Sequence, residues 1–159
     1  MTATPSPCDG SARQATIVPR MSIELPFSLK DGFDGLYGLD ITDVGPDWMR
    51  GQVQVRDELK QPGGLVHGGV YAAMSESLAS TATALEVMPH GKVAVGLSNQ
   101  TSFLRPITRG TILGEAKLKH RGRTTWVWEV ELTDDDGRLC VLSRVTVAVR
   151  DLPAQAPSR

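Results

Sequence analysis

The chain has 159 residues and a mass of 17.1 kDa, which is about the size of one domain. Its 17 basic and 18 acidic residues leave a net charge of −1, so charge gives no reason to expect binding to nucleic acid or to an anionic membrane. No apolar run is long enough for a membrane-spanning helix, and Cys8 and Cys140 have neither the spacing of a metal site nor that of a disulfide framework.

The composition changes towards both ends of the chain. Residues 1–21 are rich in Ala, Thr, Ser and Pro without apolar periodicity, which predicts a disordered or extended tail. This segment has no basic stretch followed by an apolar one, so no secretory signal is expected, and the cysteine pattern favours a reducing, cytoplasmic location. Residues 22–150 are predicted to form one domain, and residues 151–159 a second tail.

Most of the predicted domain alternates apolar and polar residues with a period of two, which is typical of strands. Strands are predicted at residues 37–42, 49–56, 93–103, 112–120, 125–132 and 141–149. A turn is expected at Gly45-Pro46, and residues 134–137 (DDDG) read as a hairpin turn. Short turns between successive strands favour an antiparallel meander.

Residues 68–88 differ from the rest, because alanine is frequent there and Pro is absent, which predicts a helix of about six turns. One face would carry bulky apolar side chains: Val70, Met74, Leu78 and Leu85. The opposite face would carry small residues around a single acid: Gly69, Ala72, Ala73, Glu76, Ala79, Ser80 and Thr83. A small-residue face lets another backbone approach closely. A long helix against an antiparallel sheet is an α+β architecture.

The segment before this helix, residues 61–69, reads QPGGLVHGG. Glycines at a helix start leave backbone N–H groups uncovered at the positive end of the helix dipole. Such a site suits acyl transfer, in which negative charge develops on a carbonyl oxygen. The alternative is that the glycines only permit a tight turn and close packing.

Glu76 has two interpretations. A helical Glu is often a solvated surface residue, but Ala72, Ala73 and Ala79 around it do not look like a solvated face. An acid held in a partly dry site could act as a base or nucleophile, and Ser80 at i+4 could hold it by a hydrogen bond.

Gly68 and Glu76 are too far apart to act on one carbonyl within one helix. They lie about 12 Å apart at ~1.5 Å per residue, whereas reacting groups must come within ~3–3.5 Å. If both act on one carbonyl, they come from different subunits, so the site predicts an isologous dimer.

The remaining polar candidates are less specific. His67 could bind substrate or bond to a backbone carbonyl in its loop, and the three histidines have no metal-ligand spacing, so no metal is expected. A basic cluster at residues 117–123, with Arg105 and Arg109 elsewhere, reads either as solvated hairpin tips or as a mouth for a phosphate-bearing ligand.

Three segments together resemble the hotdog-fold acyl-CoA thioesterases: residues 64–69 (GLVHGG), Glu76 on the long helix, and residues 98–106 (SNQTSFLRP). The most similar branch is that of the 4-hydroxybenzoyl-CoA thioesterases with a helix-borne Glu, and the phenylacetate-pathway thioesterases form a wider circle. The resemblance covers roughly residues 33–150. It implies a long central helix wrapped by a five- or six-stranded antiparallel sheet, dimers with a continuous sheet, and a homotetramer built as a dimer of dimers.

The resemblance also implies roles for residues at the motif positions. Glu76 is the nucleophile or general base, and Gly68 donates its backbone N–H to the thioester oxygen. Gln61 and His67 help to orient the substrate or water, and Ser80 is a helper hydroxyl. The family places Gln61 and Gly68 on one subunit and Glu76 and Ser80 on its partner.

Further positions are implied for coenzyme A. Arg105, Arg123 and Thr124 match positions that hold its nucleotide, and we expect Asn99 to contribute to the same binding. Arg123 replaces a smaller hydroxyl residue, Ser80 stands where close relatives carry Thr, and Thr81 stands where an acid is expected.

The implied function is hydrolysis of an acyl-CoA, with an aryl or hydroxyaryl acyl group, to the free acid and CoA without a cofactor. The alternative is a hotdog module that binds acyl-CoA without cleaving it. A hotdog hydratase is disfavoured, because its paired Asp and His in a loop–helix segment are not found.

Overall fold

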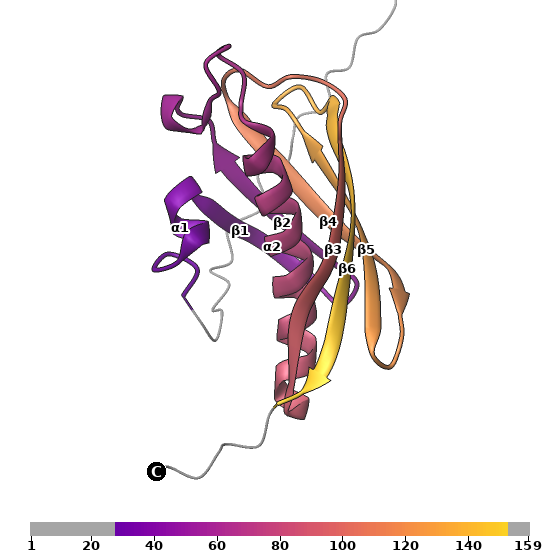
Figure 1. Ribbon diagram of the computed structural model, residues 1–159. Helices are drawn as coiled ribbons and strands as arrows, with labels where there is room; N and C mark the ends of the chain where they lie inside the picture. The colour runs from indigo at the N-terminus through magenta and orange to yellow at the C-terminus, as the bar shows by residue number, and fades with distance from the viewer. Residues whose placement is uncertain (1–27, 153–159) are drawn as a thin grey trace, which may run out of the picture.

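The computed structural model describes residues 28–152 of the chain. Its elements in chain order are α1 (Phe33–Tyr37), β1 (Leu39–Gly45), β2 (Trp48–Gln54), a 3₁₀ turn (Asp57–Leu59), α2 (Gly68–Val87), a second 3₁₀ turn (Met88–His90), β3 (Lys92–Phe103), β4 (Thr111–Arg121), β5 (Thr125–Thr133) and β6 (Leu139–Asp151). In Figure 1 the long helix α2 lies along one face of the curved sheet, and the short helix α1 lies beside it. The α+β prediction is confirmed, and the six strands match the hotdog arrangement that the resemblance implies.

The strand order across the sheet is β1-β2-β4-β5-β6-β3, with every neighbouring pair antiparallel. β4, β5 and β6 form the predicted meander, but β3 does not pair with β4. It pairs with β6 at the far edge, where Asn99 lies opposite Val145. The predicted antiparallel meander therefore holds for β4, β5 and β6 but not for β3, because residues 104–110 carry the chain from the β3 edge of the sheet to β4.

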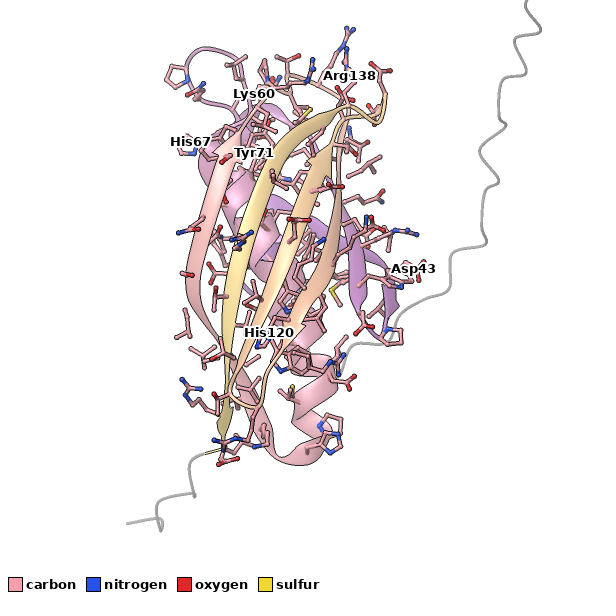
Figure 2. All side chains as sticks on the ribbon, turned by 90° about the vertical axis from the view of Figure 1, so that its right-hand side faces the viewer. Asp43, Lys60, His67, Tyr71, His120 and Arg138 are labelled. Carbon is pink, nitrogen blue, oxygen red and sulfur yellow. The ribbon has the colours of Figure 1, made fainter. Side chains whose placement is uncertain are left out.

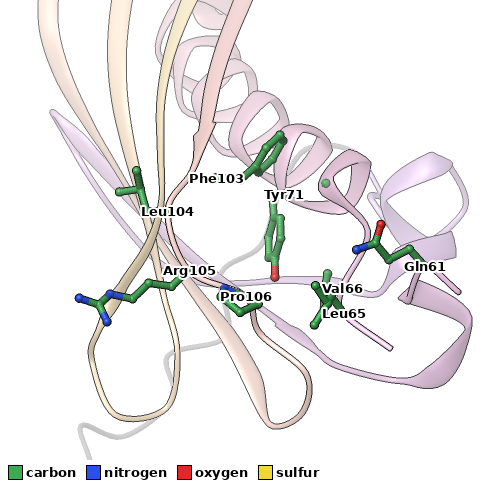
Figure 3. A pocket seen from close by; sticks show the side chains of 9 residues that line it. Gln61, Leu65, Val66, Tyr71, Phe103, Leu104, Arg105 and Pro106 are labelled. Carbon is green, nitrogen blue, oxygen red and sulfur yellow. The ribbon is translucent and has the colours of Figure 1, made fainter. Parts of the chain in front are cut away.

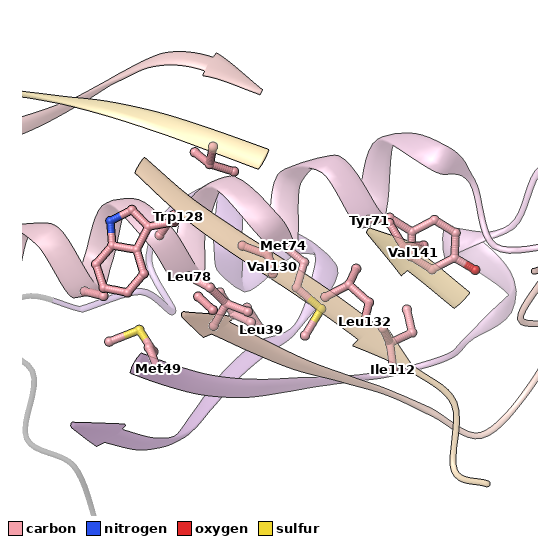
Figure 4. Packing of buried hydrophobic residues seen from close by; sticks show 14 of the residues in the cluster. Leu39, Met49, Tyr71, Met74, Leu78, Ile112, Trp128, Val130, Leu132 and Val141 are labelled. Carbon is pink, nitrogen blue, oxygen red and sulfur yellow. The ribbon is translucent and has the colours of Figure 1, made fainter. Parts of the chain in front are cut away.

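The hydrophobic core lies between α2 and the concave face of the sheet (Figure 4). β5 alternates buried and half-buried residues along its length. Its inward side chains are Trp126, Trp128, Val130 and Leu132. Trp128, Val130 and Leu132 face the region of Met74 and Leu78 of α2, which are fully buried (Figure 4). Each such side chain contributes about 1.5–3 kcal/mol, so packing against the sheet holds α2 in place.

The two predicted faces of α2 are only partly right. Met74 and Leu78 are buried as expected, but Ala79 and Thr83 of the small-residue face are also fully buried under the chain's own sheet. The indole Nε1–H of Trp128 donates to Thr83 Oγ1 at 2.9 Å, and the Thr83 hydroxyl donates to the Ala79 carbonyl at 2.8 Å. Because the sheet curves around the helix, the bulky indole needs small residues beneath it.

The first predicted strand begins too early. Tyr37 closes the short helix α1, and β1 begins at Leu39 after Gly38, whose φ of 81° ends the helix. A helix of five residues is too short to show a helical period in the sequence.

The described residues begin after the predicted start of the domain at residue 22 and reach only its carboxyl end. β6 runs to Asp151, one residue beyond the predicted domain, and Asp151 pairs with Lys92 of β3 at 2.7 Å. The predicted tail at residues 1–21 lies outside the described residues. Neither helix of the described part has the length and apolar content needed to cross a bilayer, and the cytoplasmic location stays a prediction.

Candidate functional site

The amino end of α2 is closed by the side chain of the residue before it. His67 has extended backbone angles, and its Nδ1 accepts the Gly69 N–H at 2.9 Å. The His67 carbonyl accepts the Val70 N–H at 3.0 Å. His67 is thus the N-cap of the helix and accepts a backbone N–H, whereas the structural alternative that the sequence left open was a bond to a backbone carbonyl. A His ring that accepts at Nδ1 carries its proton on Nε2.

Gly68 is the first residue of the helix, and the first N–H groups of a helix have no acceptor within it. Within residues 28–152 no side chain takes the Gly68 N–H, because the His67 ring is used by Gly69. A Cβ on Gly68 would lie 2.9 Å from the ring of Phe103. Glycine at position 68 therefore permits the close approach of this aromatic ring, which a larger residue would displace.

Gly68 lines a hollow of about 370 Å³, which we call the Gly68 hollow (Figure 3). Its lining residues are Gln61, Leu65, Val66, Gly68, Tyr71, Phe103, Leu104, Arg105 and Pro106. Most of these side chains are apolar, with the Gln61 amide and the Arg105 guanidinium at its margin. The structure therefore brings together Gln61, Gly68 and Arg105, three of the residues predicted for the site.

Tyr71 is a residue of this hollow that the sequence did not point to. Its ring is 6.1 Å from that of Phe103, and its hydroxyl accepts the Ile107 N–H at 3.3 Å. Burial raises the pKa of the Tyr71 phenol above its ordinary value. Tyr71 lies one turn after Gly68 on the same helix, and this spacing was the only signal in the sequence.

Glu76 lies at a different hollow, of about 270 Å³, which we call the Glu76 hollow. Its lining residues are Leu29, Asp34, Glu76, Ser77, Ser80, Thr81, Ala84 and Ala94. Glu76 is exposed, and a methyl group added to Gly96 would lie 3.0 Å from Glu76 Oε1. The carboxylate therefore packs over bare backbone of β3, and Ser80 lies one helical turn further along the same hollow.

A cluster from α1 forms one wall of the Glu76 hollow. Tyr37 Oη donates to Asp34 Oδ1 at 2.6 Å, and Ser77 Oγ donates to the same oxygen at 2.6 Å. Burial first, and then the hydrogen bond to Asp34, raises the pKa of the Tyr37 phenol well above its ordinary value. Sequence reasoning missed this cluster because no local pattern links Asp34 to Ser77, 43 positions away.

The two hollows have no lining residue in common. Gly68 and Gln61 belong to one, while Glu76 and Ser80 belong to the other, about 12 Å further along the helix. A single chain therefore does not bring the helix-start N–H and the carboxylate to one reacting atom.

The residues expected to bind the CoA nucleotide lie at opposite ends of the sheet. The Arg105 N–H donates to the Cys140 carbonyl near the start of β6, and the Thr124 carbonyl accepts the Val149 N–H near its end. Positions 140 and 149 are about 30 Å apart along a strand at ~3.3 Å per residue. Arg105 of one chain therefore cannot share a nucleotide with Arg123 and Thr124 of the same chain.

Three members of the basic cluster are engaged in ion pairs. Lys117 pairs with Glu115 at 2.6 Å and Lys119 with Glu129 at 2.8 Å. Arg121 pairs with both Glu86 and Asp47 and stacks on Trp126. This part of the cluster is therefore neutralised by the fold. His120 lies towards the end of the molecule away from His67 and Tyr71 (Figure 2).

Asn99, expected near coenzyme A, points its amide at the helix instead. Asn99 Nδ2 donates to the Ala72 carbonyl at 2.9 Å, and Asn99 Oδ1 accepts from the Thr101 hydroxyl at 2.7 Å. Both ends of the amide are therefore engaged within the chain. Among the described residues no group of three or more metal-ligating side chains is found.

Comparison with known proteins extends these observations. Residues 63–141 match a family described as the thioesterase superfamily. A Mycobacterium tuberculosis (strain H37Rv) protein named as an esterase, Rv1847, is 42% identical over 132 residues, which cover 82% of this chain and 93% of that protein. The 1,4-dihydroxy-2-naphthoyl-CoA hydrolase of Escherichia coli K12 is 35% identical over 115 residues, or 72% of this chain and 84% of that enzyme. A crystal structure of a mutant of thioesterase PA1618 from Pseudomonas aeruginosa has a TM-score of 0.77 at 32% identity, covering 84% of this chain and 98% of that one.

Proposed function

We propose that this chain, which belongs to the thioesterase superfamily and is a thioester hydrolase, cleaves an aryl- or hydroxyaryl-acyl-CoA to the free acid and CoA. The observation that carries the proposal is the pairing of two features on α2: a Gly68 N–H that no side chain of residues 28–152 takes, and a carboxylate at Glu76 over bare backbone. The first can polarise a carbonyl, and the second can attack it or activate water.

In this reaction the thioester oxygen accepts the Gly68 N–H, where the positive end of the helix dipole stabilises the charge that develops. Glu76 acts as nucleophile or as general base for water. The carbon–sulfur bond breaks, the acid is released after addition of water, and the CoA sulfur leaves and takes a proton. Ser80 assists Glu76, and Gln61 and His67 orient the substrate or the water.

The separation of the two hollows supports a site shared between two subunits. β3 is an edge strand, so one side of its backbone has no neighbouring strand among residues 28–152. Its exposed apolar side chains include Val95 and Leu97, which are 50% and 55% exposed. Antiparallel pairing of two β3 edges about a twofold axis would extend the sheet and place the Gly68 end of one subunit near Glu76 of its partner.

The same dimer accounts for the distance between the residues proposed for coenzyme A. A twofold axis reverses the direction of the partner, so Arg105 of one subunit would lie at the end that carries the partner's Arg123 and Thr124. A guanidinium pairs strongly with phosphate, and the nucleotide of CoA carries several. We propose a homotetramer, built from two such dimers, as the complete molecule.

The aromatic acyl group is supported by two observations. The Gly68 hollow is lined mostly by apolar side chains, including the rings of Tyr71 and Phe103. In addition, the Escherichia coli relative is named for a hydroxylated aromatic acyl-CoA. Because this hollow lies beside the Gly68 N–H, an acyl group whose carbonyl accepts that N–H would enter the hollow. The two aromatic rings favour a planar acyl group there.

The test is the Glu76→Gln variant, assayed for CoA release with a thiol reagent over benzoyl-, 4-hydroxybenzoyl-, phenylacetyl- and hexanoyl-CoA. We expect turnover to fall by about 10²–10⁴, because Gln neither attacks the carbonyl nor accepts a proton from water. Glu86→Gln, on the same helix but outside both hollows, is the control and should keep its activity. Unchanged turnover in Glu76→Gln would refute the proposed mechanism. No turnover of any aryl-CoA by the wild-type enzyme would refute the substrate class.

A further inference from the structure

Four hydrogen bonds connect α2 to β6 and β3 and then return to α2. Ser75 Oγ lies 2.9 Å from Ser143 Oγ, and Ser143 Oγ lies 2.9 Å from Thr101 Oγ1. The Thr101 hydroxyl donates to Asn99 Oδ1 at 2.7 Å, and Asn99 Nδ2 donates to the Ala72 carbonyl at 2.9 Å. We call this set of bonds the Ser75–Ala72 relay, since it leaves the helix at Ser75 and returns to it at Ala72.

The direction of every bond in the relay is fixed by counting protons. A carbonyl can only accept, so Asn99 must turn its NH₂ group to Ala72 and its oxygen to Thr101. Thr101 has one hydroxyl proton and gives it to Asn99, so Ser143 must donate to Thr101, and Ser75 must donate to Ser143. Ser75 and Ser143 are buried, with 0% and 1% exposure, so bulk water does not reach their end of the relay, whereas Asn99 and Thr101 are half-buried.

The relay contacts α2 at Ala72 and at Ser75, in the helical turn that leads to Glu76. The Ala72 carbonyl is the helical acceptor of the Glu76 backbone N–H, four residues on, so Asn99 donates to the same oxygen as Glu76. Ser75, at the other end of the relay, immediately precedes Glu76. The backbone of Glu76 is therefore tied to the sheet on both sides.

β3 supplies both this tie and the surface under the carboxylate. Gly96, over which Glu76 Oε1 packs, lies three positions before Asn99 on the same strand. Between Gly96 and Ser98 the pairing of β3 with β6 shifts register, which marks an irregularity in the strand. The distance between the Glu76 backbone and the Gly96 backbone under its carboxylate is therefore set by β3 and by the relay that joins β3 to α2.

We infer that the Ser75–Ala72 relay is a positioning device for the Glu76 carboxylate, with Asn99 and Thr101 as its positioning residues. Asn99 and Thr101 lie on the edge strand β3, which is proposed to pair with the partner subunit. The relay therefore couples the position of Glu76 to that strand. The inference rests on the proposed function, because the position of Glu76 matters only if Glu76 acts on the thioester.

The first test removes one hydroxyl while keeping the side-chain shape. Thr101→Val leaves Asn99 Oδ1 without its donor and Ser143 without its acceptor, whereas Thr101→Ser keeps the hydroxyl. A small displacement of a reacting group is costly, so we expect kcat of Thr101→Val to fall about tenfold to a hundredfold while KM changes by less than about twofold. Thr101→Ser should restore kcat to near the wild-type value.

A second variant breaks the bond between Asn99 and the Ala72 carbonyl. It replaces Thr101→Val in the test if Thr101→Val does not fold. Asn99→Asp has nearly the same size, but it places a carboxylate oxygen against the Ala72 carbonyl, so we expect the same selective loss of kcat. Circular dichroism and thermal unfolding establish that each variant is folded at the assay temperature. A loss confined to KM in both variants would instead assign these residues to CoA binding and overturn the inference.

The decisive measurement repeats Thr101→Val in the Glu76→Gln background under single-turnover conditions. If the relay acts through Glu76, the second substitution should change the residual rate by less than about twofold. An equal loss in both backgrounds would show a general structural effect and overturn the inference. Wild-type turnover in the Glu76→Gln single variant would refute the proposed function instead. If Glu76→Gln is inactive but Thr101→Val and Asn99→Asp keep full kcat, only the positioning role is refuted.

Discussion

At the residue scale, His67 has a capping role that the structure shows and a substrate-orienting role that we propose. Its Nδ1 caps α2 by accepting the Gly69 N–H, and the exposed residue directly precedes Gly68, whose N–H is proposed to meet the substrate. The sequence identified His67 as a candidate for orienting the substrate, but it did not reveal the cap. The sequence does not reveal the cap because the ring can accept the Gly69 N–H only when the backbone at residue 67 is extended.

Substitution of His67 can distinguish these roles. His67→Ala should lower the free energy of unfolding by about 1 kcal/mol, the usual cost of losing an N-cap, as measured by urea denaturation. His67→Asn can accept the Gly69 N–H and should keep the wild-type stability. If His67→Asn nevertheless loses activity, the ring is needed for the substrate. Equal stability of His67→Ala and the wild type would contradict the cap.

Helix α2 and strand β5 illustrate what packing decides at the scale of elements. The helix prediction for residues 68–88 agrees with α2, which ends at Val87. Its burial was predicted less well, because a curved sheet covers a wider arc of a helix than a flat one. Thr83 looked like part of an open face and is instead the buried hydrogen-bond acceptor of Trp128.

We expect Thr83→Val to destabilise the protein although the two side chains are similar in shape. The substitution leaves the buried Trp128 Nε1–H without an acceptor, which costs about 1–3 kcal/mol in unfolding free energy. Thr83→Ser keeps the hydroxyl and is the matched control. Chemical denaturation that ranks the two variants equally would argue against the Trp128–Thr83 bond as a source of stability.

The docking of α1 on α2 makes a prediction about alkaline pH. The pKa of Tyr37 is raised in the folded protein from an unfolded value of 10.0, so the folded state retains the phenol proton when the unfolded state loses it. The stability from Tyr37 is fully present below about pH 10 and falls as the pH rises further, by at most about 1.4 kcal/mol per pH unit. Tyr37→Phe should make this alkaline decline shallower, and an unchanged slope of stability against pH would contradict it. Tyr71, Cys140 and Lys117, whose pKa values are also raised, contribute to the decline that remains.

At the scale of the whole molecule, the proposed site needs two chains. Gly68 and Glu76 line different hollows, and Arg105 and Thr124 lie at opposite ends of the sheet. The rise of a helix per residue is sufficient to predict the separation of Gly68 from Glu76 from their positions in the sequence. Because β3 pairs with β6 on one side only, its other edge has no neighbouring strand in the described part of the chain, and a partner can join there.

Mixing two inactive variants tests the shared site directly. Glu76→Gln lacks the carboxylate, and Gly68→Val should lack the carbonyl site, because a Cβ at Gly68 meets the Phe103 ring at 2.9 Å. If each site combines Gly68 of one subunit with Glu76 of the other, refolding an equal mixture should give about one quarter of the wild-type activity, because half of the dimers are mixed and each has one intact site. Sites contained in single chains would give none.

By itself, the sequence determined the local features of this protein. Alternation of apolar residues identified the strands, alanine-rich composition identified the long helix, and the glycines before Glu76 identified the candidate chemistry. These features depend on residues close together in the chain, where periodicity and backbone preference act. Only the tertiary structure decided that β3 crosses to the far edge, that Asp34 meets Ser77, and that Asn99 reaches Ala72. Such contacts join residues distant in sequence, and they form where the curved sheet closes around the helix.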